Sequence, residues 1–224
     1  MSAELTVVSI GTLSSNPFWR EPPGVRTAHA TTSLVRDGGR TILVDPSLPA
    51  PALISRLFER TGLKAEEITD VFCTTLRPTH RRALEQFAGA RWLTGPEELE
   101  AYAGHLEGLL DAAERAGGEL ADAARADLEL IRRFEPAPEK LTDSVHRFPL
   151  PGASVGSAGL LLANPTRTWM IAGDAALTQE HVLAGRVWQG GADARAALES
   201  LREIVEIADA IVCGHDNLMV SPGR

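Results

Sequence analysis

The sequence has few cysteines, no long apolar run and no block of basic residues. Only two cysteines, Cys73 and Cys213, occur among 224 residues, each inside an apolar stretch. This argues against a disulfide scaffold or a cysteine-rich zinc site and favours a reduced compartment. A run of about eighteen apolar residues is absent, as is a basic start followed by a long apolar segment. We therefore expect a soluble cytoplasmic protein with no membrane partner.

The charge balance is acidic. The chain carries 22 basic and 30 acidic residues, a formal charge of -8, and its Lys and Arg residues are scattered. Such a chain cannot neutralise several phosphates in a row, so nucleic acid is not an expected partner. A small-molecule ligand is compatible with this composition, and so is either a monomer or a homodimer. With 44% hydrophobic residues, the chain is long enough for one domain spanning residues 1–224.

Alternating segments predict a layered α/β fold. Short stretches rich in β-branched residues predict strands at 4–10, 30–36, 41–45, 68–75, 90–94, 158–163, 167–174 and 209–213. Helical patterns predict helices at 51–63, 81–87 and 193–208, and a helical insert at about 96–140 that is broken at Gly117 and Gly118. In the first helix we expect Leu53, Leu57 and Phe58 on one apolar face, with Gly62 after its end.

Polar side chains follow several of the predicted strands. Asp45, the loop 75–80, Asp174, and His215 with Asp216 each come directly after an apolar stretch. Residues at strand ends are held rigidly and remain exposed, so such positions often carry function. Two imidazoles and a carboxylate brought together from separate strand ends would suit zinc or iron(II).

The order of these junctions resembles that of the metallo-β-lactamase superfamily. The resemblance spans nearly the whole chain and rests on the segments at 31–49, 62–80, 148–163, 168–177 and 211–216. It implies an αβ/βα four-layer sandwich that binds one or two metal ions along the edge of its two sheets.

Most of the metal ligands that the resemblance implies are replaced here. The family motif His-x-His-x-Asp-His falls on residues 75–80, where only His80 is retained and the other ligand positions hold Thr75, Arg77 and Thr79. Two further histidine positions hold Ala153 and Ser157. The bridging aspartate is Asp174, and the last histidine is His215. Asp45 matches a family aspartate expected to hydrogen-bond behind the metal ligands.

The retained ligands His80, Asp174 and His215 all belong to the second of the two metal sites that the resemblance implies. The first site keeps no histidine, so we expect it to hold no metal. The second keeps His80, Asp174 and His215, which could bind a single zinc, iron or manganese ion. Arg77 would place a positive charge about where the first metal belongs and could pair with Asp174.

Three hypotheses follow from this pattern. The first is a non-catalytic, ligand-binding pseudo-hydrolase without the dinuclear centre, with no metal cofactor. The second is a mononuclear hydrolase or oxidoreductase that uses the three retained ligands. The third is metal-free hydrolysis, in which Arg77 or the hydroxyls of Thr75 and Thr79 stabilise an oxyanion. No catalytic residue is identified by the sequence; Trp19, Trp188 and the loop 12–29 are candidates for lining a cleft.

Overall fold

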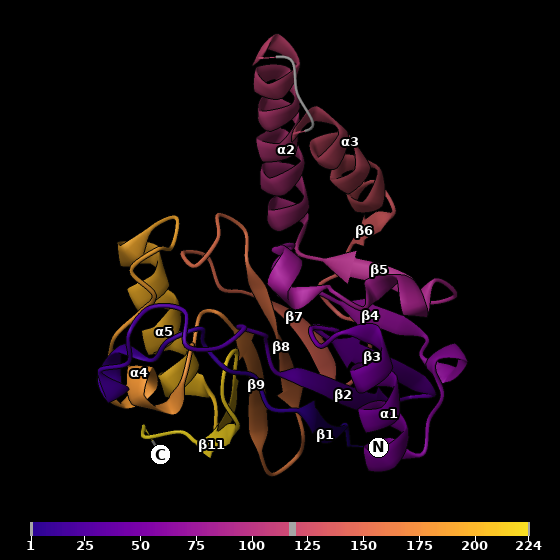
Figure 1. Cartoon of the computed structure of the whole chain (residues 1–224). Helices are drawn as coiled ribbons and strands as arrows, with labels where there is room; N and C mark the ends of the chain where they lie inside the picture. Colours follow the sequence, from indigo (N-terminus) through magenta and orange to yellow (C-terminus); the bar gives the residue numbers. More distant parts are fainter. Residues whose placement is uncertain (1, 117–119, 224) are drawn as a thin grey trace.

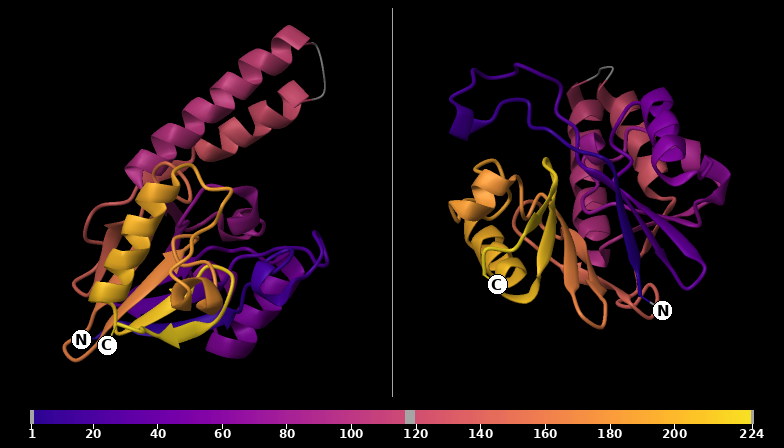
Figure 2. Two further views of the ribbon diagram at one scale, coloured as in Figure 1. Left: turned by 90° about the vertical axis from the view of Figure 1, so that its left-hand side faces the viewer. Right: turned by 90° about the horizontal axis from the view of Figure 1, so that it is seen from below.

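Two β-sheets packed face to face, with helices on the outer face of each, make up the body of the protein (Figures 1 and 2). A computed structural model describes residues 2–116 and 120–223. The strands are β1 (Glu4–Ser9), β2 (Thr32–Asp37), β3 (Arg40–Val44), β4 (Asp70–Phe72), β5 (Arg91–Thr94), β6 (Phe134–Pro136), β7 (Val145–Pro149), β8 (Ala158–Ala163), β9 (Thr168–Gly173), β10 (Ala210–Cys213) and β11 (Leu218–Val220). The α-helices are α1 (Ala50–Thr61), α2 (Pro96–Ala116), α3 (Leu120–Ile131), α4 (Gln179–Leu183) and α5 (Ala194–Ile207).

Each sheet combines antiparallel and parallel pairs. The first sheet has the strand order β1-β2-β3-β4-β5-β6, antiparallel from β1 to β3 and parallel from β3 to β6. The second has the order β11-β10-β9-β8-β7, in which only β9 and β10 are parallel. Because β3 and β4 run the same way, as do β9 and β10, each parallel pair delivers two loops to one edge of its sheet.

Three apolar clusters define the four layers. One lies between the first sheet and α1 with the base of the α2–α3 pair, one between the sheets, and one between the second sheet and α4 with α5. Strand β3 shows the alternation that produces this: Leu43 belongs to the first cluster, whereas Ile42 and Val44 face the other sheet. The α/β four-layer arrangement expected from the sequence is therefore confirmed.

Helices α2 and α3 form a hairpin between β5 and β6 that projects from the body (Figures 1 and 2). Their lower turns contact the first apolar cluster through Leu106, Leu128 and Ile131. The predicted break at Gly117 and Gly118 lies outside the described residues. Across the described ranges, no helix is long and apolar enough to span a membrane.

Local signals predicted several boundaries correctly. Gly38 and Gly39 adopt φ values of 57° and 81° in the turn between β2 and β3, a conformation that glycine reaches without strain. Gly62, with φ of 72°, ends α1 in the left-handed conformation. Asp193 caps α5 by accepting hydrogen bonds from the backbone N–H groups of residues 195 and 196.

Other expectations were wrong. Residues 81–87 do not form an α-helix, and only a short 3-10 turn is present at Leu84–Phe87. The strand expected at 68–75 is limited to Asp70–Phe72, because the following residues turn away to form the loop at the sheet edge. Phe58 does not share the buried face of α1: it is 57% exposed, whereas Leu53 and Leu57 are fully buried.

The contrast between Leu57 and Phe58 provides a test of the first apolar cluster. The Leu57→Ala variant should lower the free energy of unfolding by about 2–5 kcal/mol, because it leaves a cavity in a packed interface. Phe58→Ala is the control, and its expected cost is below about 1 kcal/mol because the ring is mostly in solvent. Urea unfolding measures both; equal costs would contradict the described packing of α1.

Candidate metal centre

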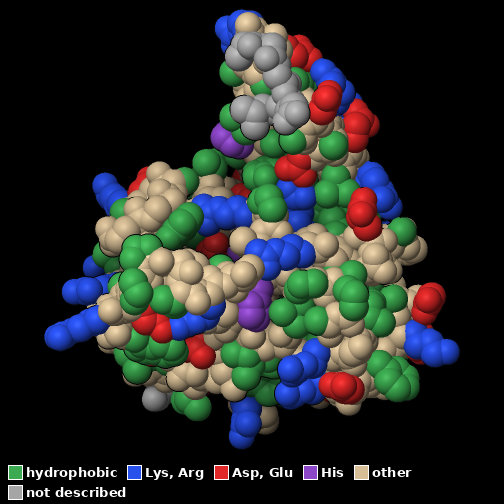
Figure 3. Space-filling model, viewed as in Figure 1, with side chains coloured by type: hydrophobic (Ala, Val, Ile, Leu, Met, Phe, Trp, Pro, Cys, Tyr) green, Lys and Arg blue, Asp and Glu red, His purple; other side chains and the backbone are tan. Residues whose placement is uncertain are grey.

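Loops from both sheets meet at one edge of the sandwich. Asp45 follows β3, the loop 73–80 follows β4, Asp174 follows β9, and His215 lies two residues after β10. The space-filling view shows histidine and basic side chains exposed close together near the middle of this face (Figure 3). Side chains that are far apart in the sequence are thus brought together by the parallel strand pairs.

Two glycines allow the loops to approach closely. A Cβ on Gly173, whose φ is +54°, would lie 2.4 Å from the Thr74 hydroxyl of the facing sheet. A Cβ on Gly214 would lie 2.5 Å from the carbonyl oxygen of Gly173. Neither position can hold a larger residue without moving the backbone, so the glycines fix how near Asp174 and His215 lie to the loop that carries His80.

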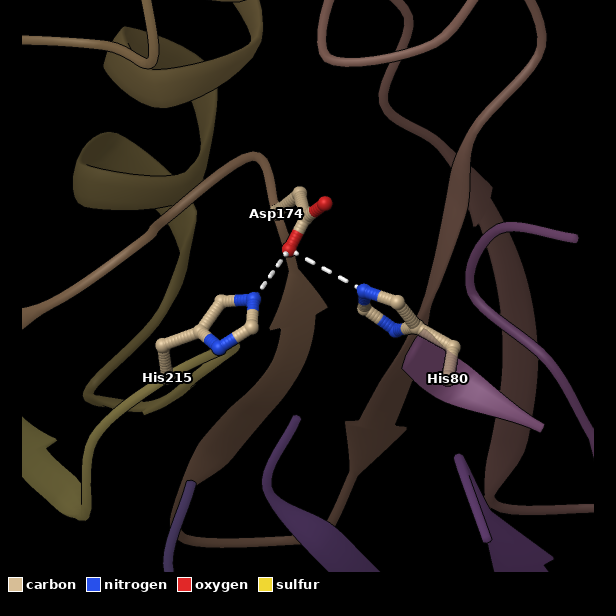
Figure 4. Close-up of side chains that lie close together, drawn as sticks. All are labelled: His80, Asp174 and His215. Atoms are coloured by element: carbon tan, nitrogen blue, oxygen red, sulfur yellow. Dashed lines mark hydrogen bonds and ion pairs between the residues drawn. The ribbon is translucent and has the colours of Figure 1, made fainter. Parts of the chain in front are cut away.

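The three retained family ligands converge in the structure. The ligand atoms of His80, Asp174 and His215 lie within 4.8 Å of one another, and all three residues are buried. Nε2 of His80 lies 3.2 Å and Nε2 of His215 lies 3.1 Å from the same oxygen, Oδ1 of Asp174 (Figure 4). Sequence analysis proposed these residues as one site, and the fold brings them together.

The outer nitrogen of each imidazole faces an acceptor. His80 Nδ1 lies 3.1 Å from Asp45 Oδ2, and His215 Nδ1 lies 2.9 Å and 3.1 Å from the carbonyl oxygens of His29 and Thr12. These contacts are favourable only if Nδ1 carries the proton. In the neutral imidazoles, both Nε2 lone pairs then point at Asp174, and Nε2 of His80 is buried without a hydrogen bond. A cation between these atoms would relieve the repulsion, so the residues fit a single divalent metal ion.

Asp45 supports His80 from behind. Its carboxylate accepts hydrogen bonds from the backbone N–H of Thr74 at 2.8 Å and from the Thr74 hydroxyl at 2.7 Å, in addition to its contact with His80. The residue has φ of 50°, an uncommon conformation for a residue other than glycine. Asp45 thus fixes the orientation of the His80 ring, which is what a carboxylate behind a ligating histidine does.

Arg77 occupies the other side of Asp174. Its Nη1 lies 3.0 Å from Oδ2 of Asp174, the oxygen that the histidines do not contact. Its Nη2 donates to the carbonyl oxygen of Ala153, and the guanidinium lies 4.2 Å from the centre of the Trp188 ring. The predicted pair between Arg77 and Asp174 is therefore present. Trp188 belongs to the site, as one of the two tryptophans proposed to line it.

Burial and the neighbouring charges shift the pKa values of His80 and Asp174 in opposite directions. Burial by itself lowers the pKa of His80, but the carboxylates of Asp174 and Asp45 outweigh it and raise that pKa to about 10. Burial likewise raises the pKa of Asp174, yet the charge of the neighbouring His80 holds it well below its usual value. Without a metal, His80 is therefore protonated and Asp174 ionised at neutral pH.

The remaining predicted positions do not contribute ligand atoms to the cluster. The Thr75 hydroxyl donates to Glu98 at 2.7 Å, and the Ser157 hydroxyl donates to the carbonyl oxygen of Leu150 at 2.7 Å. Ala153 is buried and offers only its carbonyl oxygen, to Arg77. Thr79 contributes its carbonyl oxygen to the Ser47 hydroxyl.

Other histidines and Trp19 lie away from the cluster. His29 contributes its backbone carbonyl oxygen to His215, but its partly buried ring points elsewhere, with Nε2 at 3.1 Å from the carbonyl oxygen of Ile10. His181 is buried against Thr178 and Phe18, and burial lowers its pKa. Trp19 is 59% exposed and donates to Glu180. Of the loop 12–29, the backbone at Thr12 and His29 reaches the site.

Glu98 also belongs to this region and was not predicted from the sequence. This residue lies in the first turn of α2, is 1% exposed, and accepts hydrogen bonds from Thr75, Leu76 and Ser154. The sequence marked this region only as a helical insert at about 96–140, and the hydrogen-bond partners of Glu98 are distant in the sequence.

A cavity of about 420 Å³ adjoins this side of the site. It opens between α2 and three loops, and its lining includes Arg77, Glu98, His105, Ser154 and Gly191. Its size lies within the range of small-molecule pockets. A molecule in this cavity would contact Arg77, whose remaining N–H groups have no protein partner among the described residues.

Comparisons with known proteins agree with this geometry. The family model described as the metallo-beta-lactamase superfamily matches residues 26–215, and no curated protein sequence matches the chain significantly. Among solved structures, a Thermotoga maritima protein of the metallo-beta-lactamase type is 18% identical with a TM-score of 0.69, covering 98% of this chain and 100% of that chain.

Two further solved structures carry bound acyl-homoserine molecules. AidC, a dizinc quorum-quenching lactonase in complex with its product, is 16% identical with a TM-score of 0.68, covering 86% of this chain and 75% of that chain. AiiA of B. thuringiensis, with N-decanoyl-L-homoserine at its active site, is 18% identical with a TM-score of 0.65, covering 96% and 93%. At these identities the likeness shows the fold alone. Because the family model spans most of the sequence, this chain belongs to the metallo-beta-lactamase superfamily.

Proposed function

We propose that the chain binds one divalent metal ion through His80, Asp174 and His215 and hydrolyses an uncharged ester or lactone. The observation that carries this proposal is the convergence of two Nε2 atoms on one oxygen of Asp174 while both Nδ1 atoms face acceptors. Histidines that ligate a metal commonly show this arrangement, with the outer N–H bound to a carboxylate or carbonyl group.

Arg77 supplies the positive charge that a first metal ion would otherwise provide, so one metal ion is enough at this site. It binds Oδ2 of Asp174 and leaves Oδ1 to the histidines, so the two oxygens of this carboxylate serve two different cations. The first-metal positions hold Thr75, Arg77 and Ala153, none of which offers a metal ligand side chain of the usual kind. One metal ion and one fixed guanidinium therefore take the place of two metal ions.

The chemistry divides between the ion and the chain. A bound divalent ion would lower the pKa of water and polarise a carbonyl oxygen. Arg77 is placed to donate its free N–H groups to an oxygen that gains negative charge. Asp45 keeps His80 in the required tautomer, and the Trp188 ring packs against the guanidinium that binds Asp174 and Ala153.

The charges at the site favour an uncharged substrate. Asp45, Glu98 and Asp174 carry three negative charges, while Arg77 and one divalent ion carry three positive charges, so the sum is near zero. A site with no excess positive charge gains little from a phosphate group or another anion. A structural neighbour supports an uncharged ester or lactone as the substrate, since AidC is described as a lactonase.

A non-catalytic pseudo-hydrolase is the second candidate, and one observation favours it. Arg77 and protonated His80 balance Asp45 and Asp174 without any metal, because the pKa of His80 is raised to about 10. Such a closed ion network would be stable at neutral pH. In that case the cavity beside Arg77 would bind a ligand without converting it.

Metal content separates the two candidates. Protein purified without a metal-binding tag should contain about one zinc, iron or manganese ion per chain by inductively coupled plasma mass spectrometry. The His80→Ala and His215→Ala variants should lose that ion, whereas His105→Ala, in the hairpin, should keep it. A metal-free but fully folded wild-type protein would favour the pseudo-hydrolase.

Metal affinity should rise with pH. In the metal-free protein the raised pKa of His80 means that its proton stabilises the fold fully below pH 6.5, and that this stabilisation is lost as the pH rises through about 10. The metal must displace that proton, so the affinity for Zn²⁺ should increase by about tenfold per pH unit between these limits. Competition with a chelator measures this; an affinity independent of pH would exclude His80 as a ligand.

Substrate charge and Arg77 can be tested together. The metal-loaded protein should hydrolyse 4-nitrophenyl acetate and leave bis(4-nitrophenyl) phosphate intact. Arg77→Ala should lower kcat/KM for the ester by at least about tenfold, because an oxyanion donor is lost. Arg195→Ala, which removes an exposed guanidinium on α5, is the control. Faster hydrolysis of the phosphate diester would contradict the charge argument.

A further inference from the structure

We infer that Glu98 is a positioning residue that takes over the cross-linking role of a first metal ion and holds Arg77 over Asp174. A metal ion in the first site would join the loop 73–80 to the loop 150–157, since the family positions fall at residues 75, 77 and 153. Here a carboxylate from the helical hairpin joins the same two loops. The functional part of this inference rests on the proposed single-metal site.

The bonds of Glu98 reach both loops. Its Oε1 accepts from the Thr75 hydroxyl at 2.7 Å and from the backbone N–H of Leu76 at 2.9 Å. Its Oε2 accepts from the Ser154 hydroxyl at 2.6 Å. Thr75 and Ser154 are, respectively, a former ligand position and the neighbour of one, so the carboxylate spans the place where the first metal would have linked them.

Arg77 makes a second bridge between the same loops. Its side chain starts in the loop 73–80 and donates to the carbonyl oxygen of Ala153, the residue before Ser154. Glu98 lies behind this bridge, because it binds the two residues that immediately precede Arg77. A change at Glu98 should therefore move Arg77 indirectly. It would free the backbone before Arg77 in one loop and Ser154, next to the Ala153 carbonyl group, in the other.

The start of α2 is packed so that Glu98 has little freedom. A Cβ on Gly156 would lie 2.1 Å from the backbone nitrogen of Glu98, and a Cβ on Gly95 would lie 2.9 Å from the carbonyl oxygen of Gly156. The loop 150–157 thus lies directly on the first turn of the helix. This contact places the carboxylate between the loops with a precision that a surface side chain would lack.

The burial of this charge is compensated by hydrogen bonds. Glu98 is 1% exposed, and no Lys or Arg of the described chain forms an ion pair with it. A buried carboxylate without a cation depends on its hydrogen-bond donors, and each donor is left unsatisfied if the carboxylate is removed. Glu98 is therefore a buried, fully hydrogen-bonded carboxylate and not one of the solvated charges on the helix surface.

The cavity beside Arg77 depends on the same carboxylate. Glu98, Arg77 and Ser154 line it together. Because Glu98 fixes Ser154 and the residues before Arg77, it sets the distance between two of the cavity walls. The position of these two walls is thus fixed by side chains of the protein itself.

The test compares Glu98→Ala and Glu98→Gln with Glu100→Gln, a control on the same helix whose side chain is exposed and forms no ion pair among the described residues. Amide hydrogen exchange is followed by mass spectrometry in the full-length protein with a chelator present. We expect Glu98→Ala to speed exchange in peptides covering 73–80 and 150–157 by about tenfold, with β8, β9 and α5 unchanged. Glu98→Gln should recover much of the protection, since its amide oxygen still accepts from Leu76; Glu100→Gln should change nothing.

A second measurement tests the link to the metal site. In Co²⁺ titrations, Glu98→Ala should weaken binding about tenfold and Glu98→Gln less, as for residues that support ligands indirectly. Unchanged exchange in both loops, or equal acceleration throughout the protein, would overturn the inference. If the wild type binds no metal yet the loops respond as expected, the cross-link stands and the single-metal proposal fails; if the wild type binds metal and the loops do not respond, only the cross-link fails.

Discussion

The arrangement of the site depends on how one buried carboxylate, that of Asp174, is neutralised. Asp174 is 7% exposed, and its two oxygens face different partners: two imidazoles at Oδ1 and a guanidinium at Oδ2. A charge at this depth is stable only if its surroundings supply opposite charge and hydrogen bonds. The retained histidines and Arg77 supply this opposite charge and these hydrogen bonds.

A guanidinium and a metal ion meet this requirement in different ways. Arg77 is permanently charged, tethered and independent of metal supply, so the Oδ2 side of Asp174 is satisfied as soon as the chain folds. The imidazole side is conditional, because it is satisfied either by a proton on His80 or by a metal ion. The site therefore combines a fixed cation with an exchangeable one. This asymmetry explains how the three ligand positions of the first site, 75, 77 and 153, can be lost while His80, Asp174 and His215 still converge.

Most strands of both sheets and the three converging residues His80, Asp174 and His215 were predicted from the sequence, because local signals mark them. The turn at Gly38 and Gly39, the end of α1 at Gly62 and the strand-end residues Asp174 and His215 are each marked by the residues themselves. Phe58 and residues 81–87 were misassigned because periodicity does not show which side of a helix a neighbouring sheet covers, nor how a loop shortens a helical pattern. Glu98 was missed because its partners lie 22 to 56 residues away, and no local pattern encodes such contacts.

The helical hairpin is consequently better understood as part of the site than as an appendage. The peptide groups of Leu76 are held from both sides, its N–H by Glu98 of α2 and its carbonyl oxygen by Arg81. Arg81 in turn pairs with Asp127 of α3. Both helices thus fix the backbone just before Arg77, whose guanidinium neutralises Asp174. The α2–α3 hairpin therefore contributes, at its base, the contacts that keep the guanidinium of Arg77 next to the carboxylate of Asp174.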